Sequence, residues 1–442
     1  IGMIEGKDPA ALTAPLASLL ASITAVPVPG HDWHPASAFG PAARPAADVP
    51  SALAMIPDDG LPILIAGSLY LAGEVLRHLP GIDLMIDSMT RLPLADDAKA
   101  RMVLRIMLAQ TLALETPPHA TIATALPLLQ GGPRKLAHGV FGSLMRAGVT
   151  LPPPEVPTAT AHRWQAAWGD AMVEAAGKAL GTPPPLDLAL ADAAGTDTLS
   201  EQLGGLSLIP GHVRLPRGGA VELIPGFDEG GWWVQDISAS LPARLLGTSR
   251  GGHVLDLCAA PGGKTMQLAA AGWQVTALDN SEKRLRRLRQ NLKRTGLEAQ
   301  TITANLLEWR PDEQADAVLL DAPCSATGIF RRHPDVLYRI APRHIEERAE
   351  QQAVLLERAA NWVKPGGLLV YAVCSLEPEE GEAVVDQFLA ADSRFEIDPV
   401  RADELPAGVQ PDALGRVRTL PGMLADAGGL DGFFMARLRR VA

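Results

Sequence analysis

The feature that most constrains this chain is an alternation, from about residue 243 onward, of short apolar segments with longer amphipathic ones. Such alternation is typical of βαβ units, in which helices cover a sheet of parallel strands. Strands are expected at 253–258, 273–279, 300–304, 315–321 and 367–374, and helices at 263–271, 281–295, 343–363 and 379–391. A last apolar run at 432–438 predicts a final, antiparallel strand. The C-terminal part, 241–442, is therefore expected to adopt a Rossmann-like α/β fold.

The rest of the chain has a different pattern, and a length of 442 residues favours more than one domain. Between about residues 61 and 146, apolar residues recur at helical spacing, which predicts an all-α bundle within 1–150. Six prolines within 26–50 predict a flexible loop or insertion there. Residues 151–240 mix helical and turn-rich segments and are expected to form a small connecting domain.

Composition narrows the class of protein. No apolar run approaches the roughly 18 residues that a transmembrane helix needs, so no membrane association is expected. Three cysteines are few and odd in number, which favours free thiols, a cytoplasmic location and no metal site. The net charge of −11 differs from the basic balance usual in nucleic-acid-binding proteins, so any such contact must come from local patches. We expect a monomer.

A glycine turn follows the first expected strand of the α/β part and leads into the helix at 263–271. This arrangement directs backbone N–H groups and the positive end of a helix dipole toward a ligand. A phosphate loop would need glycine where Cys258 stands, and a dinucleotide fingerprint needs Gly-x-Gly-x-x-Gly, whereas the turn has only adjacent Gly262 and Gly263. An S-adenosylmethionine pocket fits better, because no pyrophosphate has to be held.

The residues expected to line this pocket come from successive strand ends. The turn contributes Cys258, Ala259, Ala260, Pro261, Gly262, Gly263 and Lys264. Asp279 ends the next strand, where its carboxylate can accept both ribose hydroxyls, and Asn305 follows the third strand, near the expected adenine edge. Each residue alone would equally suit a structural turn or cap, but their order along the chain favours the cofactor.

Two cysteines, Cys324 and Cys374, follow or end apolar strands, and each precedes a serine. A thiolate that adds to C6 of a pyrimidine turns the unreactive C5 into a nucleophile able to attack a methyl sulfonium. This chemistry needs an accessible thiolate, a group on the polar edge of the base and a second group that assists elimination. The side chains of Cys324, Cys374 and Asp321 are of the chemical types that these three roles need. The alternative is that both cysteines are small buried apolar residues.

Three motifs carry a resemblance to a known family. They are Asp-Ala-Pro-Cys-Ser-Ala-Thr-Gly-Ile-Phe-Arg-Arg-His-Pro-Asp at 321–335, the turn at 258–264, and Cys-Ser-Leu-Glu-Pro-Glu-Glu at 374–380. The chain resembles the Sun-type RNA cytosine-C5 methyltransferases over roughly residues 60–440. Val-Gln-Asp at 234–236 is similar to the segment that opens the family's catalytic domain, and the helical part looks like a NusB-type RNA-binding domain.

The resemblance implies a function and a role for each motif residue. The fold would be that of class I methyltransferases, and the product would be 5-methylcytosine in small-subunit (16S) ribosomal RNA. Cys374 would be the nucleophile, and Cys324 would assist release of the methylated base. The residues from Cys258 to Lys264, with Asp279, Asn305 and Asp321, would bind S-adenosylmethionine.

The chain departs from the family pattern at two positions, where Asn305 and Ala239 stand in place of the usual aspartate and serine. An asparagine carbonyl can still accept from adenine, so weakened rather than lost cofactor binding is expected. Two alternative functions stay open. One is methylation of a cytosine in transfer RNA or another RNA, and the other is a non-catalytic RNA-binding assembly factor, against which the intact cysteine pair argues.

RNA contacts are expected next to the target base. Arg331 and Arg332 directly follow the Cys324 loop and are the predicted phosphate contacts. The cations along 281–295 are interpreted mainly as a solvated helix face, around a leucine stripe that packs on the sheet. In the helical part, Arg134, Lys135 and Arg146 are further candidate contacts.

Overall fold

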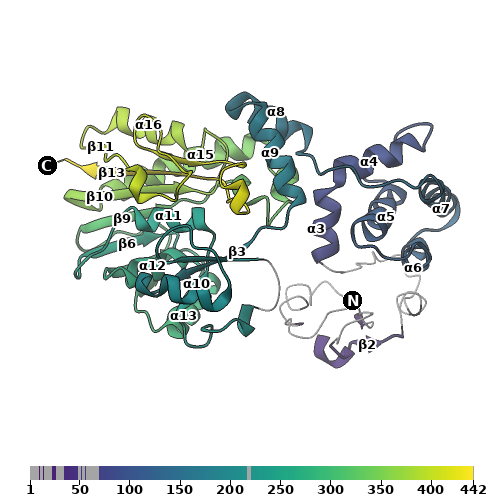
Figure 1. Cartoon of the computed structure of the whole chain (residues 1–442), viewed down its shortest axis with the longest axis horizontal. Coiled ribbons are helices and arrows are strands. Elements are labelled where there is room, and N and C mark those ends of the chain that lie inside the picture. The colour runs from purple at the N-terminus through teal and green to yellow at the C-terminus, as the bar shows by residue number, and fades with distance from the viewer. Residues whose placement is uncertain are drawn as a thin grey trace. The chain divides into compact units, whose positions relative to one another are not determined.

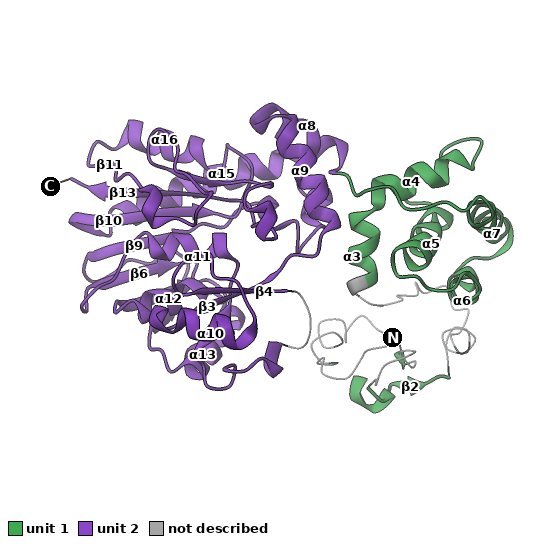
Figure 2. Ribbon diagram, viewed as in Figure 1, with its two compact units in different colours: residues 1–155 green, residues 156–442 purple. Residues whose placement is uncertain are grey.

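The computed structural model describes residues 22–25, 34–47, 69–216 and 221–441, with the single positions 9, 13, 51 and 55. The chain divides into two compact units, 1–155 and 156–442 (Figure 2). Residues 156–240 belong to the same unit as the α/β sheet. The assignment of domains to 1–150, 151–240 and 241–442 stays a prediction.

The N-terminal unit is built from short helices around one apolar core (Figure 1). They are α3 (Leu69–Arg77), α4 (Leu79–Ser88), α5 (Lys99–Leu108), α6 (Pro118–Ala125) and α7 (Gly131–Arg146). Leu104 and Met107 of α5 and Phe141 of α7 are fully buried in this core. The buried guanidinium of Arg105 pairs with Asp83 of α4 at 2.6 Å, which ties α5 to its neighbour. The likeness to NusB stays a prediction.

The proline-rich stretch at 26–50 is described only between residues 34 and 47. That part carries a 3-10 helix, η2 (Ala36–Phe39), and the short strand β2 (Arg44–Pro45). β2 pairs in parallel with β1 (Thr24–Ala25). Residues 26–33 and 48–50, as well as the apolar positions expected to be helical at 61–65, lie outside the described residues.

The second unit contains an eight-stranded sheet, which confirms the predicted Rossmann-like fold of class I methyltransferases. Its strands are β6 (His253–Leu257), β7 (Gln274–Asp279), β8 (Gln300–Thr303), β9 (Ala315–Asp321), β10 (Val363–Val373), β11 (Phe395–Ile397), β12 (Val417–Thr419) and β13 (Phe433–Arg440). The order is β11-β13-β10-β9-β6-β7-β8, and β12 pairs with β13. Strands β6 to β10 are parallel, and β13 runs antiparallel to β10, as predicted.

Alternating side chains of the sheet face two helical layers (Figure 1). Val254 packs in the core with α11, α12 and α13, while the next residue, Leu255, packs in the core with α15 and α16. The helices are α11 (Ile237–Arg244), α12 (Gly263–Ala270), α13 (Glu282–Thr295), α15 (Pro342–Ala360) and α16 (Glu382–Ala391). This period of two explains why the strands read as continuous apolar runs: both faces are covered.

Helix α13 shows how local sequence sets an element. The Ser281 hydroxyl caps the first turn by accepting from Arg284 N, and Gly296 ends the helix in the left-handed conformation. The predicted leucine stripe is confirmed, because Leu285, Leu288 and Leu292 are buried. The cations between them face outward.

The largest difference between a predicted and an observed boundary in the α/β part is at the start of β10. The last parallel strand was expected at 367–374, but β10 begins at Val363. Val363 pairs with Ala315 and Leu368 with Ala317, so five residues of β10 span two residues of β9. The intervening Lys364-Pro365-Gly366-Gly367 forms a bulge, although its composition predicts only a helix stop.

The remainder of the second unit is a small mixed assembly. A three-stranded antiparallel sheet has the order β4-β3-β5, from β3 (Leu186–Leu190), β4 (His212–Leu215) and β5 (Trp232–Val234). Helices α8 (Thr158–Trp168), α9 (Asp170–Gly181) and α10 (Thr196–Leu203) accompany it. Across the described parts of the chain, every helix is too short or too polar to cross a membrane. Within the same ranges, no cluster of three His, Cys, Asp or Glu residues could hold a metal ion.

Candidate active site

The expected cofactor turn follows β6, the strand at which the order of strands in the sheet changes direction. β6 pairs with β7 on one side and with β9 on the other, so a crevice forms beyond the carboxyl ends of these strands. Cys258 leaves the strand in the left-handed region at φ 62°, and Gly262 caps α12 at φ 107°. A Cβ on Gly262 would lie 2.7 Å from Leu288 Cγ, so only glycine fits between the turn and α13. The N–H groups that open α12 therefore face this crevice.

Asp279 and Asn305 lie at the ends of β7 and β8. Asp279 is 2% exposed, and its carboxylate accepts from Ala260 N at 3.2 Å and Ser281 N at 2.9 Å. A carboxylate has further lone pairs, so it can still accept from ribose hydroxyls. Asn305 is exposed, and its Oδ1 accepts from Leu307 N at 3.1 Å. Its amide caps the local turn. The donor set at these strand ends fits S-adenosylmethionine.

An ion pair joins the cofactor turn to the neighbouring strand. Lys264 Nζ lies 2.7 Å from Asp321 Oδ2, at the first turn of α12 and the end of β9. Burial acts to lower the pKa of Lys264, but the attraction of Asp321 outweighs it, and the pKa is raised above its ordinary value. The negative charge of the Cys374 thiolate would raise it further. Lys264 is thus a fixed positive charge beside Asp321.

The two predicted thiols converge. Cys324 Sγ lies 3.4 Å from Cys374 Sγ, because each cysteine follows one of the adjacent strands β9 and β10. The hydrogen bond with Cys374, together with burial, raises the pKa of the Cys324 thiol well above its ordinary value. The third thiol has a separate environment: burial raises the pKa of Cys258 to about 12. Cys258 therefore stays protonated at neutral pH.

A buried carboxylate that the sequence analysis did not single out holds the two cysteine loops together. Glu380 is fully buried and accepts from Ser325 N at 2.8 Å and from the Ser325 hydroxyl. It also accepts from the Ser375 hydroxyl at 2.7 Å and from Gln352 Nε2 at 2.8 Å. Glu380 is the last residue of the motif at 374–380, and the serine after each cysteine was a second signal that could have pointed to it.

Two further features fix the loop that follows Cys374. Trp168 Nε1 of α8 donates to Leu376 O at 2.8 Å, and Trp164 Nε1 donates to Glu377 Oε1 at 3.1 Å. Gly328 N donates to Cys374 O at 3.0 Å, and a Cβ at this glycine would lie 1.9 Å from the carbonyl oxygen of Gly432. The cysteine loops are thus held from three segments that are distant in sequence.

The expected phosphate contacts need correction. Arg331 is 2% exposed and donates to Gly428 O at 2.5 Å, so the prediction that it contacts RNA phosphate is wrong for this residue. Arg332 forms ion pairs with Asp431 at 2.6 Å and Asp236 at 2.9 Å. Both side chains point into the protein. The acceptors that hold them there are a backbone carbonyl and two carboxylates from segments distant in sequence. A contact of Arg332 with RNA stays a prediction.

The comparisons with known proteins agree with this geometry. The model of the family "16S rRNA methyltransferase RsmB/F" matches residues 243–439. The ribosomal RNA small subunit methyltransferase B of Enterobacter sp. (strain 638) is 41% identical over 234 residues, which span about half of each chain (52%). The protein of that name from Klebsiella pneumoniae subsp. pneumoniae is 34% identical over 82% of this chain and 87% of its own.

A solved structure shares the fold. PH0851 superposes with a TM-score of 0.68 at 24% identity, over 84% of this chain and 89% of that one. The resemblance found in the motifs is therefore confirmed, and with it S-adenosylmethionine as the cofactor. By its identity to the Klebsiella protein over most of both lengths and by the match of its α/β part, the chain belongs to the RsmB/F family of 16S rRNA methyltransferases.

Proposed function

We propose that this protein is an RNA cytosine-C5 methyltransferase that forms 5-methylcytosine in small-subunit ribosomal RNA. The observation that carries the proposal is the distance of 3.4 Å between Cys324 Sγ and Cys374 Sγ, at the strand ends beside the cofactor turn. Cytosine C5 reacts with an electrophilic methyl group only after a nucleophile has added to C6. The names of the relatives, which refer to small-subunit ribosomal RNA, support the substrate class.

Cys374 is the proposed nucleophile. Its thiolate forms a bond to C6, and the electrons of the C5–C6 double bond then make C5 nucleophilic. S-adenosylmethionine, when bound, supplies a methyl group on a positively charged sulfur. After methylation, loss of the C5 proton and cleavage of the S–C6 bond restore the aromatic ring and the thiolate. The ammonium group of Lys264, whose pKa responds to the charge of Cys374, favours the thiolate form.

Cys324 is the proposed assistant in release of the product. The hydrogen bond with Cys374, together with burial, raises the pKa of Cys324, so this thiol stays protonated at neutral pH and lies 3.4 Å from the Cys374 sulfur in the resting site. When the Cys374 sulfur is bonded to C6, that hydrogen bond is lost. Cys324 then lies next to the ring, and once its own proton has passed to solvent its thiolate can accept the C5 proton.

Lys264 and Asp321 are the proposed contacts to the polar edge of the base. The pair presents a donor and an acceptor 2.7 Å apart, at a strand end that neighbours the thiols. Cytosine presents an amino donor at N4 next to an acceptor at N3, which matches this arrangement and not the edge of uracil. To reach the pair and both thiols, the cytosine must leave its stack, which costs least in a single-stranded loop.

RNA recognition is assigned in part to the N-terminal unit. We propose that the helical region within 1–150 acts as a NusB-like RNA-binding domain, that 151–240 connects it, and that 241–442 is catalytic. Arg134, Lys135 and Arg146 are exposed on α7, in keeping with this role. Proteins recognise RNA helices largely by their shape, so a domain with few cationic side chains can still bind RNA.

The proposal is tested by transfer of labelled methyl groups to small-subunit ribosomal RNA, followed by mapping of the product. We expect 5-methylcytosine from the native enzyme and none from Cys374→Ala, which should still bind S-adenosylmethionine. Cys324→Ala should accumulate a protein–RNA adduct on a denaturing gel, because release is slowed. If 5-methylcytosine appeared only in transfer RNA, the substrate would be transfer RNA and not ribosomal RNA. Normal turnover by Cys374→Ala would refute the covalent mechanism.

A further inference from the structure

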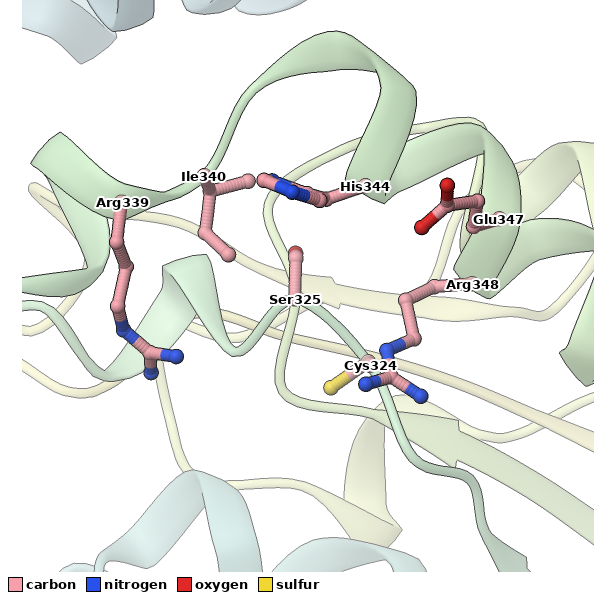
Figure 3. Close-up of a pocket in the computed structure, with 7 residues that line it drawn as sticks. All are labelled: Cys324, Ser325, Arg339, Ile340, His344, Glu347 and Arg348. Atoms are coloured by element: carbon pink, nitrogen blue, oxygen red, sulfur yellow. The ribbon is translucent and has the colours of Figure 1, made fainter.

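A pocket of about 240 Å³ opens beside Cys324. Its lining comes from the Cys324 loop, the end of α14 (Val336–Arg339) and the first turns of α15. The residues are Cys324, Ser325, Arg339, Ile340, His344, Glu347 and Arg348 (Figure 3). The lining includes neither Cys374 nor the Lys264–Asp321 pair, so this pocket shares only Cys324 with the residues proposed to surround the target ring.

The pocket is rimmed by cationic side chains. In Figure 3 the guanidinium of Arg348 points from α15 toward the side where the Cys324 thiol lies, and Arg339 faces the opening from the other side. Arg339 Nε donates a hydrogen bond to Asp335 Oδ2 at 2.9 Å, so this contact does not use the terminal nitrogens of the guanidinium. Arg348 Nη1 donates to Gln351 Oε1, a neutral group, at 2.6 Å. Both arginines are exposed, so a ligand can reach them.

Two other polar residues line the pocket. His344 adds a hydrogen-bond donor, and Glu347 is an acid whose charge is balanced. His344 Nδ1 accepts from Ala341 N at 3.1 Å, so a neutral ring carries its proton on Nε2 and can donate. The Glu347 carboxylate lies 3.5 Å from Arg343 Nε, which balances its charge from outside the lining. The pocket therefore offers donors and positive charge to an anionic ligand with a polar body.

We propose that this pocket holds the RNA nucleotide adjacent to the target cytosine, with Arg339 and Arg348 contacting its phosphate. The inference rests on the proposed function. A flipped base stays joined to its neighbours, so the chain must continue past the thiol pair, and the pocket opens directly at Cys324. Arginine suits phosphate because its planar fork donates two hydrogen bonds at once. Arg331 is buried, so contact with the RNA phosphate is assigned to these two residues instead.

The test compares Arg339→Gln, Arg348→Gln and the double variant with Arg287→Gln as a matched control. Arg287 is an exposed residue of α13 and does not line the pocket. The probe is a short single-stranded RNA that contains cytosine, and binding is measured by fluorescence anisotropy at several salt concentrations. Loss of two contacts should weaken binding about tenfold and reduce the slope of log affinity against log salt by about 1.4.

A second measurement separates this inference from the proposed function. With ribosomal RNA, the double variant should raise KM with little change in kcat, and S-adenosylmethionine binding should stay native. An unchanged salt slope, or an equal loss in Arg287→Gln, would overturn the assignment of the phosphate to this pocket. If the native enzyme methylates no RNA, the proposed function fails, while the anisotropy series still decides whether the pocket binds the strand.

Discussion

The hydroxyl oxygens of Ser325 and Ser375 lie 3.1 Å apart, and both groups donate to the carboxylate of Glu380. Each serine directly follows a cysteine of the converging pair, so one side chain sets the spacing of both thiols. We predict that Glu380→Gln reduces kcat by about two orders of magnitude with little change in KM for RNA, because a displacement of about 1 Å at a reacting group has an effect of that size.

The control for this prediction is the neighbouring Glu379→Gln. Glu379 is exposed, so its neutralisation should leave both the rate and the stability unchanged. Glu380→Gln should also lower the free energy of unfolding by about 1–3 kcal/mol, because buried donors then face a weaker acceptor. A variant with native kcat would show that the cysteine spacing does not depend on Glu380.

The short distance between the thiols predicts that they can be joined by oxidation. Diamide, which takes up the two hydrogens of a dithiol, should convert Cys324 and Cys374 to a disulfide and abolish methyl transfer, and a reducing agent should restore it. Cys258 serves as an internal control, since burial raises its pKa to about 12 and leaves it in the unreactive thiol form. Peptide mass mapping should find one bridged pair and one free thiol. A bridge that includes Cys258 would contradict the geometry.

Much of the α/β fold could be predicted because its strands are covered on both faces and because helices such as α13 are bounded by a capping serine and a terminal glycine. The position of Cys324 beside Cys374 followed from the same reasoning, since both come after strands that proved to be neighbours. The bulge at the start of β10 could not be predicted, because the proline and glycines there equally suit a helix end. Its cause is the pairing with β9, which sequence spacing does not reveal.

The charged residues of the site were harder to predict, because their partners are distant in sequence. Arg332 is paired with Asp236 and Asp431, which lie 96 and 99 residues away. An arginine that follows a catalytic loop has the same local sequence whether it meets phosphate or carboxylate. Glu380 escaped notice for the same reason, since Ser325 and Gln352 reach it from other segments.

Lys264 should control the reactivity of the nucleophile. We predict that Lys264→Gln lowers the rate of Cys374 alkylation at neutral pH by about tenfold, because the lost positive charge no longer favours the thiolate. The measurement is made in a Cys324→Ser background, so that only Cys374 reacts. Lys283→Gln, which neutralises an exposed residue of α13, is the control and should not change the rate. An equal rate in Lys264→Gln would remove this lysine from activation of the thiol.

Asp256, the fourth of the five residues of β6, should make stability depend on pH. It is fully buried, Thr265 Oγ1 donates to its Oδ2 at 2.5 Å, and its Oδ1 has no partner among the described residues. Burial raises the pKa of Asp256 from 3.8 to about 7. The folded protein thus keeps the proton up to about pH 7, while the unfolded chain releases it near pH 4. The free energy of unfolding should therefore fall as pH rises between these values and level off above them.

Asp256→Asn should remove this decline, which amounts to roughly 4 kcal/mol across the window. The amide can still accept from Thr265 and carries no charge at any pH, so the variant should match the native protein near pH 4 and exceed it at pH 8. Asp392→Asn is the contrasting control. The hydrogen bond from Arg394 lowers the pKa of Asp392, so its stabilisation is lost as pH falls, and the variant should keep the decline above pH 4. Denaturant unfolding from pH 4 to pH 8 measures all three proteins, and a native slope in Asp256→Asn would assign the pH dependence to another group.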